Sequence, residues 1–267
     1  MKFRIALAQT EPCLFDKDAN LEKAERFIRQ AASAGAALVM FPELYLTGYT
    51  LGERAAQMAE TTAGPGVCRA AAMARAHGVA VMMGYAELDA STGCAYDAVF
   101  LADREGQVVG SYRKIHLYRQ ENEWFVAGTR PGVFEFALGR VGLMICYDIE
   151  FPEMPRLLAL QGADWLAVPT GNMRPYERPQ AVYLQARALE NHVWVASVNR
   201  VGREGEIDFF GESAVSDPLG NIVAQAGQAE TLLVADIDLG LNARARLYGD
   251  YLAERKPQLY GRLVERR

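Results

Sequence analysis

Residues 141–153 read Val141-Gly-Leu-Met-Ile-Cys146-Tyr-Asp-Ile-Glu150-Phe-Pro-Glu153. The first five form an apolar run typical of a buried strand, and the residues from Phe151 onward predict a turn that leads into a helix over 152–161. Cys146 is therefore expected at the carboxyl end of a strand, where α/β sheets bind ligands and where a helix dipole favours the thiolate. This pattern predicts a nucleophile, although a cysteine that only closes a buried strand would look the same.

The composition is that of an ordinary globular protein. The chain has 267 residues, 51% of them hydrophobic and 23% charged, which is enough for one large domain or two small ones. The net charge of −5 is spread along the chain and gives no electrostatic footprint for nucleic acid; the basic end made by Arg262, Arg266 and Arg267 is too short to count as one.

Targeting and metal-binding signals are weak. No apolar run approaches the length needed to span a membrane, and residues 3–9 are too short for the apolar part of a secretion signal. The four cysteines are scattered, without metal-ligand spacing or a disulfide pattern. We therefore expect a soluble cytoplasmic protein that needs no metal and no organic cofactor and binds neither membrane nor nucleic acid.

Predicted strands and helices alternate along the chain. Strands are expected over 3–9, 36–41, 79–87, 95–102, 108–113, 133–138, 141–145, 165–169, 193–198, 213–223 and 231–237, and helices over 18–34, 53–60, 66–77, 152–161 and 176–191. Asp18 or Asn20 is the expected cap of the first helix, and Gly35 its stop. Because no linker or repeat divides the chain, residues 1–267 predict one α/β domain of two sheets with helices outside. The amphipathic segment 242–267 is expected to pack on the body or on a partner subunit.

Three of the predicted strands end in residues that suit acyl transfer. Glu43 follows the strand over 36–41, Lys114 follows 108–113, and Cys146 follows 141–145. A shielded glutamate can act as the base for a thiol, and a lysine can stabilise the oxyanion that forms on an attacked carbonyl. The backbone N–H of Tyr147 is the expected second donor to that oxyanion.

Three motifs make the sequence resemble the nitrilase superfamily, the carbon-nitrogen hydrolases. They are Phe41-Pro-Glu43-Leu-Tyr-Leu-Thr-Gly48-Tyr49, Tyr112-Arg-Lys114-Ile-His116-Leu117 and Cys146-Tyr-Asp-Ile-Glu150-Phe-Pro-Glu153, in the family's order. The resemblance covers nearly the whole chain, and three motifs together are far more specific than any one of them.

This resemblance implies a four-layer α-β-β-α sandwich and a Glu-Lys-Cys triad, with Glu43 as general base, Lys114 as oxyanion stabiliser and Cys146 as nucleophile. Members also carry a second glutamate in the loop after the lysine. The segment Glu121-Asn-Glu-Trp-Phe125-Val-Ala-Gly128 fits that pattern with Glu121, and Glu123 is the competing choice.

The residues after the cysteine indicate the branch of the family. Tyr147-Asp148 is similar to amide-cleaving members, whereas nitrile-cleaving members typically have Trp-Glu. The expected reaction is therefore hydrolysis of a small aliphatic carboxamide to carboxylate and ammonia through a thioester, with Asn172 as a further substrate contact.

Three further stretches, near 170–176, 205–207 and 255–260, resemble 5-aminopentanamidases, which hydrolyse an ω-amino amide. An ammonium at the far end of such a substrate would need a carboxylate, for which Glu206, Asp208 and Glu150 are the candidates. Surface acids without a role would look the same in the sequence.

Rival hypotheses remain at this stage. Within the family they are an N-carbamoyl-amine hydrolase and an ω-amidase, the latter needing a cationic pocket from Arg174 or Arg178. From another class, a catalytically silent scaffold is the alternative, although Glu43, Lys114 and Cys146 are all present. The family commonly dimerises, and apolar faces over 154–160, 182–188 and the tail predict a homodimer or higher homo-oligomer.

Overall fold

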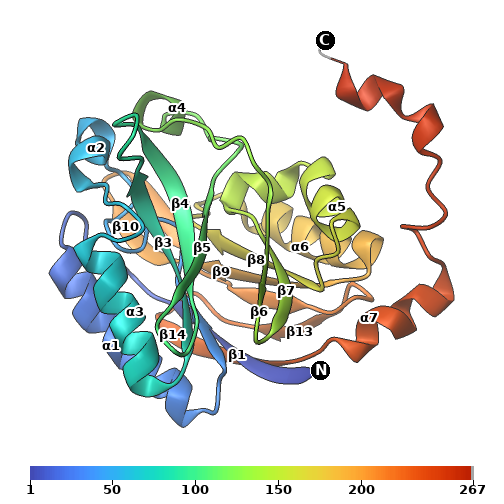
Figure 1. Ribbon diagram of the computed structural model, residues 1–267, viewed down its shortest axis with the longest axis horizontal. Coiled ribbons are helices and arrows are strands. Elements are labelled where there is room, and N and C mark those ends of the chain that lie inside the picture. Colours follow the sequence, from blue (N-terminus) through green and yellow to red (C-terminus); the bar gives the residue numbers. More distant parts are fainter. Residues whose placement is uncertain (266–267) are drawn as a thin grey trace.

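The computed structural model describes residues 1–265 and contains two six-stranded mixed sheets (Figure 1). The first sheet has the order β14-β1-β2-β3-β4-β5 and the second β13-β12-β9-β8-β7-β6, and β10 and β11 form a separate hairpin. The strands of the first sheet are β1 (Lys2–Gln9), β2 (Leu38–Met40), β3 (Ala80–Leu88), β4 (Ala95–Ala102), β5 (Val108–Arg113) and β14 (Thr231–Asp238). Those of the second are β6 (Gly132–Phe136), β7 (Gly139–Leu143), β8 (Trp165–Thr170), β9 (Trp194–Asn199), β12 (Ala214–Ser216) and β13 (Ile222–Gln225).

Helices cover the outer face of each sheet. The α-helices are α1 (Lys17–Ser33), α2 (Ala55–Met58), α3 (Pro65–His77), α4 (Glu121–Trp124), α5 (Glu153–Leu160), α6 (Glu177–Asn191) and α7 (Gly240–Ala245). In Figure 1, α1 and α3 lie outside the first sheet, and α5 and α6 lie outside the second. The predicted α-β-β-α order of layers is therefore confirmed.

The side-chain alternation of the strands explains this layering. In β1, Ile5 and Leu7 join the core between the sheets, while Ala6 and Ala8 pack against α1 and α3. Small residues on the helix-facing side allow close packing of helices on the sheet, and larger residues fill the space between the sheets. All six residues of β8 and of β9 are buried, as expected for central parallel strands that are covered on both faces.

The structure corrects several local predictions. The cap of α1 is Asp16, whose carboxylate accepts from the Ala19 N–H at 2.9 Å, and not Asp18 or Asn20. The segment predicted as one strand over 213–223 is two strands, β12 and β13, joined by a turn at Gly220. The hairpin of β10 (Val201–Glu204) and β11 (Ile207–Phe210) was not predicted, because four-residue strands give too short a pattern.

The C-terminal segment extends from the body as an arm, drawn in red in Figure 1. Asn242 donates to the Asp164 carbonyl at 2.6 Å, and the Tyr251 ring stacks on His192 with centroids 4.9 Å apart. Leu247, Leu259 and Val264 are exposed. The predicted basic end lies partly outside the described residues, at Arg266 and Arg267. Across residues 1–265, no helix is both long and apolar enough to cross a membrane.

Candidate active site

The glutamate of the first motif is placed by the end of β2. After Met40 the chain continues along β3, because the Phe41 N–H donates to the Met82 carbonyl and the Leu46 N–H donates to the Gly84 carbonyl, at 2.8 and 3.0 Å. A Cβ at Gly84 would lie 2.3 Å from the Pro42 carbonyl oxygen, so only glycine permits this approach. The Glu43 side chain is 0% exposed as a result.

Lys114 directly follows β5. Its N–H donates to the Asp97 carbonyl at 2.8 Å, and its carbonyl accepts from the Gly128 N–H at 2.7 Å. Its ammonium donates to Glu43 and to Glu121 Oε2, the latter at 2.7 Å, and lies 3.3 Å from Asp97 Oδ2. Burial alone would lower the pKa of Lys114, but the surrounding carboxylates outweigh it and raise that pKa well above its ordinary value. Lys114 is therefore a permanent buried cation.

The structure distinguishes the two loop glutamates. Glu121 is 1% exposed and accepts from Lys114, from the Tyr49 hydroxyl at 2.5 Å and from the Tyr118 N–H at 2.8 Å. Glu123 is exposed on the far side of the α4 turn. Only Glu121 of these two residues lies in the buried cluster.

Cys146 begins a 3₁₀ turn over Cys146–Glu150, with a left-handed φ of +44° that a non-glycine residue rarely adopts. The buried Asp148 carboxylate holds this turn by accepting from the Ile145 N–H at 3.0 Å. It also accepts from the Tyr112 hydroxyl at 2.8 Å and the His116 N–H at 2.9 Å, which ties the turn to the end of β5. The helix predicted over 152–161 forms as α5 (Glu153–Leu160), and the 3₁₀ turn separates its N-terminus from the cysteine.

This placement corrects the prediction of a resting thiolate. Burial and the Glu43 carboxylate raise the pKa of the Cys146 thiol well above its ordinary value, against the opposing effects of Lys114 and of a hydrogen bond from the Gly171 backbone. The thiol donates to Asn172 Oδ1 at 3.3 Å. A protonated thiol needs a base before it can act as a nucleophile.

The thiol opens onto a small aromatic cavity of about 20 Å³. Its lining residues come from both sheets and their loops: Tyr49, Tyr118, Cys146, Tyr147, Glu150, Asn172, Met173 and Tyr176. An adjoining cavity of about 140 Å³ shares Tyr49, Tyr118 and Met173 with it. Tyr147 and Asn172, the two predicted substrate contacts, both line the first cavity.

The candidates for recognising a distal charge are not equivalent. Glu150 lines the cavity, whereas Glu206 is exposed and Asp208 pairs with Arg174 at 3.3 Å. Arg174 also pairs with Glu177. Neither Arg174 nor Arg178 lines either of the two cavities, so the cationic pocket required for an ω-amidase is not formed by them.

Sequence reasoning missed three residues that support the site. Asp97 lies inside β4 and touches the Lys114 ammonium, and Asp148 holds the cysteine turn. Glu204, at the end of β10, accepts from the Tyr49 and Thr50 N–H groups at 3.0 and 2.8 Å. Asp148 stands in the quoted cysteine motif, but the contacts of Asp97 and Glu204 depend on distant parts of the chain.

Glu43, Asp97 and Glu121 together offer carboxylate oxygens within 4.8 Å of one another, a spacing that suits a metal ion. The Lys114 ammonium is the cation that these three carboxylates face. A salt-bridged lysine therefore takes the role that a metal would have in such an acidic cluster.

Comparison with known proteins identifies the class. The family model for carbon-nitrogen hydrolases matches residues 4–247, and the chain belongs to that family. It is 39% identical over 98% of its length to a Pseudomonas protegens protein named "Hydrolase in pqqF 5'region", covering 92% of that protein. It is 38% identical over 85% of its length to an (R)-stereoselective amidase from a Pseudomonas species, covering 82% of it.

A solved amidase from Nesterenkonia sp. superposes with a TM-score of 0.88 at 31% identity, over 98% of this chain and 96% of that one. One structure of a variant of that enzyme shows the acetamide moiety of fluoroacetamide added covalently at the active-site cysteine. The chain is thus a carbon-nitrogen hydrolase with amidase relatives and a Glu43-Lys114-Cys146 arrangement typical of the family.

The raised pKa of Cys146 predicts a pH dependence of stability. The unfolded thiol ionises near pH ~8.5 while the folded thiol keeps its proton, so unfolding releases a proton above that pH. The free energy of unfolding should fall between the unfolded and folded pKa values, with up to ~1.4 kcal/mol per pH unit from this group. Cys146→Ser should remove this component in urea unfolding measured from about pH 7.5 to about pH 9.5.

The control is Cys68→Ser, which removes an exposed thiol and should leave the pH slope unchanged. Equal slopes for wild type and Cys146→Ser would contradict the assignment of a protonated thiol.

Proposed function

We propose that this chain is a cysteine-dependent amidase that hydrolyses a small aliphatic carboxamide to a carboxylate and ammonia. The observation that carries the proposal is the position of the thiol. Cys146 lines a small cavity, and Glu43 and Lys114 form a fully buried ion pair. A Cβ at Gly171 would lie 2.9 Å from Glu43 Oε2, and the next residue, Asn172, accepts from the thiol at 3.3 Å, so both groups lie beside the same stretch of backbone.

In the first half of the proposed cycle, Glu43 takes the thiol proton while the sulfur attacks the amide carbonyl carbon. The carbonyl oxygen becomes an oxyanion, which the Lys114 ammonium and the Tyr147 N–H stabilise. When the C–N bond breaks, Glu43 returns the proton to the leaving nitrogen. Ammonia departs, and the acyl group stays on Cys146 as a thioester. Because the thiol rests protonated, a base in contact range is required for this step.

In the second half, Glu43 takes a proton from water, and the hydroxide attacks the thioester carbonyl. The C–S bond breaks, Glu43 returns its proton to the Cys146 sulfur, and the carboxylic acid leaves and loses its proton to solvent. Glu121 accepts from the Lys114 ammonium throughout and fixes its position. No step calls for a metal or an organic cofactor.

The size of the cavity supports a small substrate. Cavities of about 20 and about 140 Å³ have room for only a few non-hydrogen atoms unless the aromatic rings between them move. Tyr118 lines both cavities, and its hydroxyl lies 2.9 Å from that of Tyr176, which lines the first.

Ammonia release from a panel of amides tests the reaction. The panel contains butyramide, 5-aminopentanamide, glutaramate and N-carbamoylputrescine, with butyronitrile as the nitrile. We expect one amide to be turned over and Cys146→Ala to lower the rate by at least about 10⁴-fold, as loss of a catalytic nucleophile does. The matched control is Cys68→Ala at an exposed cysteine, which should leave the rate unchanged.

Each result of the panel has a meaning. Equal inertness of wild type and Cys146→Ala on every compound would favour a silent scaffold. Carbon dioxide released together with ammonia would identify a carbamoyl-amine hydrolase, and preference for glutaramate would identify an ω-amidase.

Among amides, we propose that an ω-amino amide is preferred. Glu150 lines the thiol cavity, and burial raises the pKa of its carboxylate against the opposing effects of a Tyr183 hydrogen bond and of Arg187. A substrate ammonium beside Glu150 would offset this desolvation. This agrees with the resemblance to 5-aminopentanamidases.

Glu150→Gln should lower kcat/KM for 5-aminopentanamide by about fivefold or more, ~1 kcal/mol, because a partly exposed ion pair is lost. The kcat/KM of this variant for the uncharged pentanamide should stay within about twofold of the wild-type value. Glu206→Gln, at an exposed carboxylate, is the control. An equal loss of kcat/KM for both substrates would show that Glu150 supports the fold of the pocket and does not bind the substrate ammonium.

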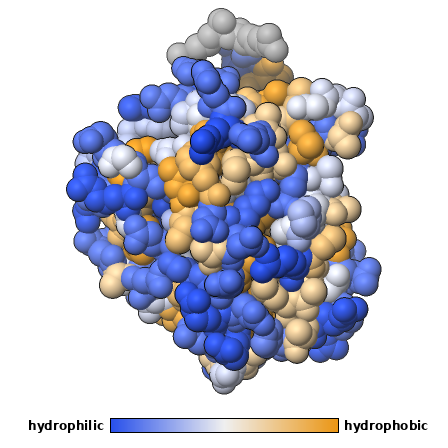
Figure 2. All heavy atoms as spheres, turned by 90° about the vertical axis from the view of Figure 1, so that its left-hand side faces the viewer, coloured by the Kyte–Doolittle hydropathy of each residue, from blue (hydrophilic) through white to orange (hydrophobic). Residues whose placement is uncertain are grey.

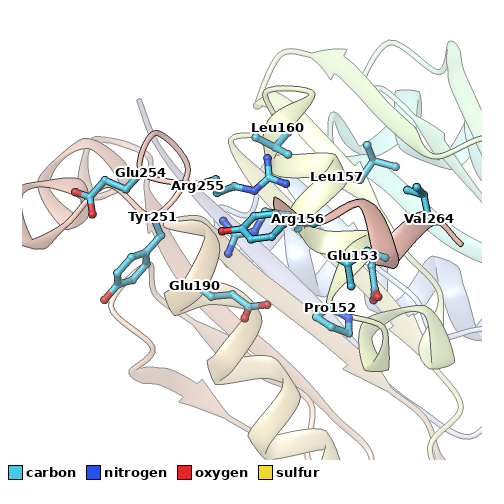
Figure 3. A pocket seen from close by; sticks show the side chains of 12 residues that line it. Pro152, Glu153, Arg156, Leu157, Leu160, Glu190, Tyr251, Glu254, Arg255 and Val264 are labelled. Carbon is cyan, nitrogen blue, oxygen red and sulfur yellow. The ribbon is translucent and has the colours of Figure 1, made fainter. Parts of the chain in front are cut away.

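We also propose that the chain forms a homodimer through α5, α6 and the C-terminal arm. Leu157 and Leu160 of α5 are 40% and 46% exposed, and Val182 and Leu189 of α6 are 50% and 43% exposed. The arm and α5 border a groove of about 810 Å³, where Figure 3 shows Leu157, Leu160 and Val264 around the open space. On the face seen in Figure 2, hydrophilic and apolar residues are interspersed. Exposed apolar side chains along a groove, as on α5 and the arm, are typical of an association site.

Sedimentation at micromolar concentration should therefore give about twice the chain mass of 29.4 kDa. Val182→Asp should shift the equilibrium toward monomer, because it buries a charge in the interface. Val126→Asp, at a valine of similar exposure outside these elements, should not. If the wild type sediments as a monomer, the proposal of a homodimer is wrong.

A further inference from the structure

Asp97 is a buried carboxyl group to which the proposed cycle gives no role. It lies inside β4, is 0% exposed, and contacts the Lys114 ammonium at 3.3 Å. The same ammonium also faces Glu43 and Glu121. If all three carboxyl groups were ionised, one cation would face three anions away from water, which is a costly arrangement.

The three carboxyl groups around Lys114 differ in the number of hydrogen bonds that they accept. Glu121 accepts from Lys114, the Tyr49 hydroxyl and the Tyr118 N–H. Glu43 accepts from Lys114 through Oε1. Neither oxygen of Asp97 accepts a hydrogen bond from a group in the described chain, and Glu43 Oε2 has no such donor either.

Two ionised carboxylates can only accept hydrogen bonds, so Asp97 and Glu43 cannot bond to each other when both are ionised. A proton on one of them makes that hydrogen bond possible. Oxygen atoms of Asp97, Glu43 and Glu121 lie within 4.8 Å of one another. Burial and the Glu43 carboxylate raise the pKa of Asp97 well above its ordinary value, against the effect of Lys114. Burial also raises the pKa of Glu121, but Glu121 accepts hydrogen bonds from three donors, whereas Asp97 accepts none from the described chain. The geometry therefore assigns the proton to Asp97.

We propose that Asp97 is a positioning residue held as an un-ionised carboxylic acid, which donates its proton to Glu43 and leaves only two carboxylates to share the Lys114 charge. This inference rests on the proposed amidase function for its consequence. A neutral Asp97 orients the Glu43 carboxylate by this hydrogen bond. It also adds no negative charge beside the Lys114 ammonium, which can then stabilise an oxyanion more strongly.

Infrared spectroscopy tests the protonation state without turnover. At neutral pH, exposed carboxyl groups are ionised, so the carbonyl stretch of an un-ionised acid reports a buried one. Wild type and Cys146→Ala should both show this band, and Asp97→Asn should lack it. Glu123→Gln, at an exposed carboxylate, is the matched control and should retain it. A wild type without the band, or an Asp97→Asn variant that keeps it, would overturn the proposal.

Turnover of the best amide tests the role. Asparagine is neutral, with one donor and one acceptor end, so Asp97→Asn should keep kcat/KM within about threefold of wild type. Asp97→Ala should lower it by about tenfold or more, because Glu43 loses its partner. A loss of about 100-fold in Asp97→Asn, with the thermal midpoint retained, would show that an ionised carboxylate is needed and would overturn the proposal. An inactive wild type would instead refute the amidase function, and the infrared result would stand.

Discussion

The buried ammonium of Lys114 is the interaction on which the rest of the site depends. A fully dehydrated cation is unstable unless acidic groups surround it, and here three carboxyl groups contact it from three different elements of the first sheet and its connections. Glu43 follows β2, Asp97 lies in β4 and Glu121 begins α4. Satisfying one charge therefore fixes the relative positions of segments that are up to 78 residues apart in the chain, from residue 43 to residue 121.

The thiol reaches this cluster from the second sheet. Cys146 follows β7, and the turn that carries it is joined to the end of β5 by the Asp148 carboxylate, which accepts from Tyr112 and His116. The site thus lies where the ends of the two sheets meet. The proposed nucleophile on one sheet and the proposed base and cation on the other are held in place by a buried hydrogen-bond network, which rigidifies a site better than exposed contacts do.

A second layer of contacts stabilises the first motif. Glu204 accepts from the Tyr49 and Thr50 N–H groups and is paired with the buried Arg200, while the Tyr49 hydroxyl donates to Glu121. The β10–β11 hairpin is therefore connected through Tyr49 to the Lys114 cluster. The left-handed backbone at Leu44 and at Cys146, with φ of +47° and +44°, persists because such contacts determine the local structure fully.

The sequence by itself determined the fold class, most of the strands and helices, and the three residues at the centre. Apolar runs that stop before Glu43 and Cys146 indicate the ends of buried strands, and the strand pattern over 108–113 ends before Lys114, because hydrophobic periodicity and turn residues are local properties. Sequence could not choose between Glu121 and Glu123, which share one turn, and it missed Asp97, Asp148 and Glu204. Only the tertiary structure decided these, and it also reversed the expected state of the thiol, because burial and the contacts between distant charges set pKa values and hydrogen-bond partners.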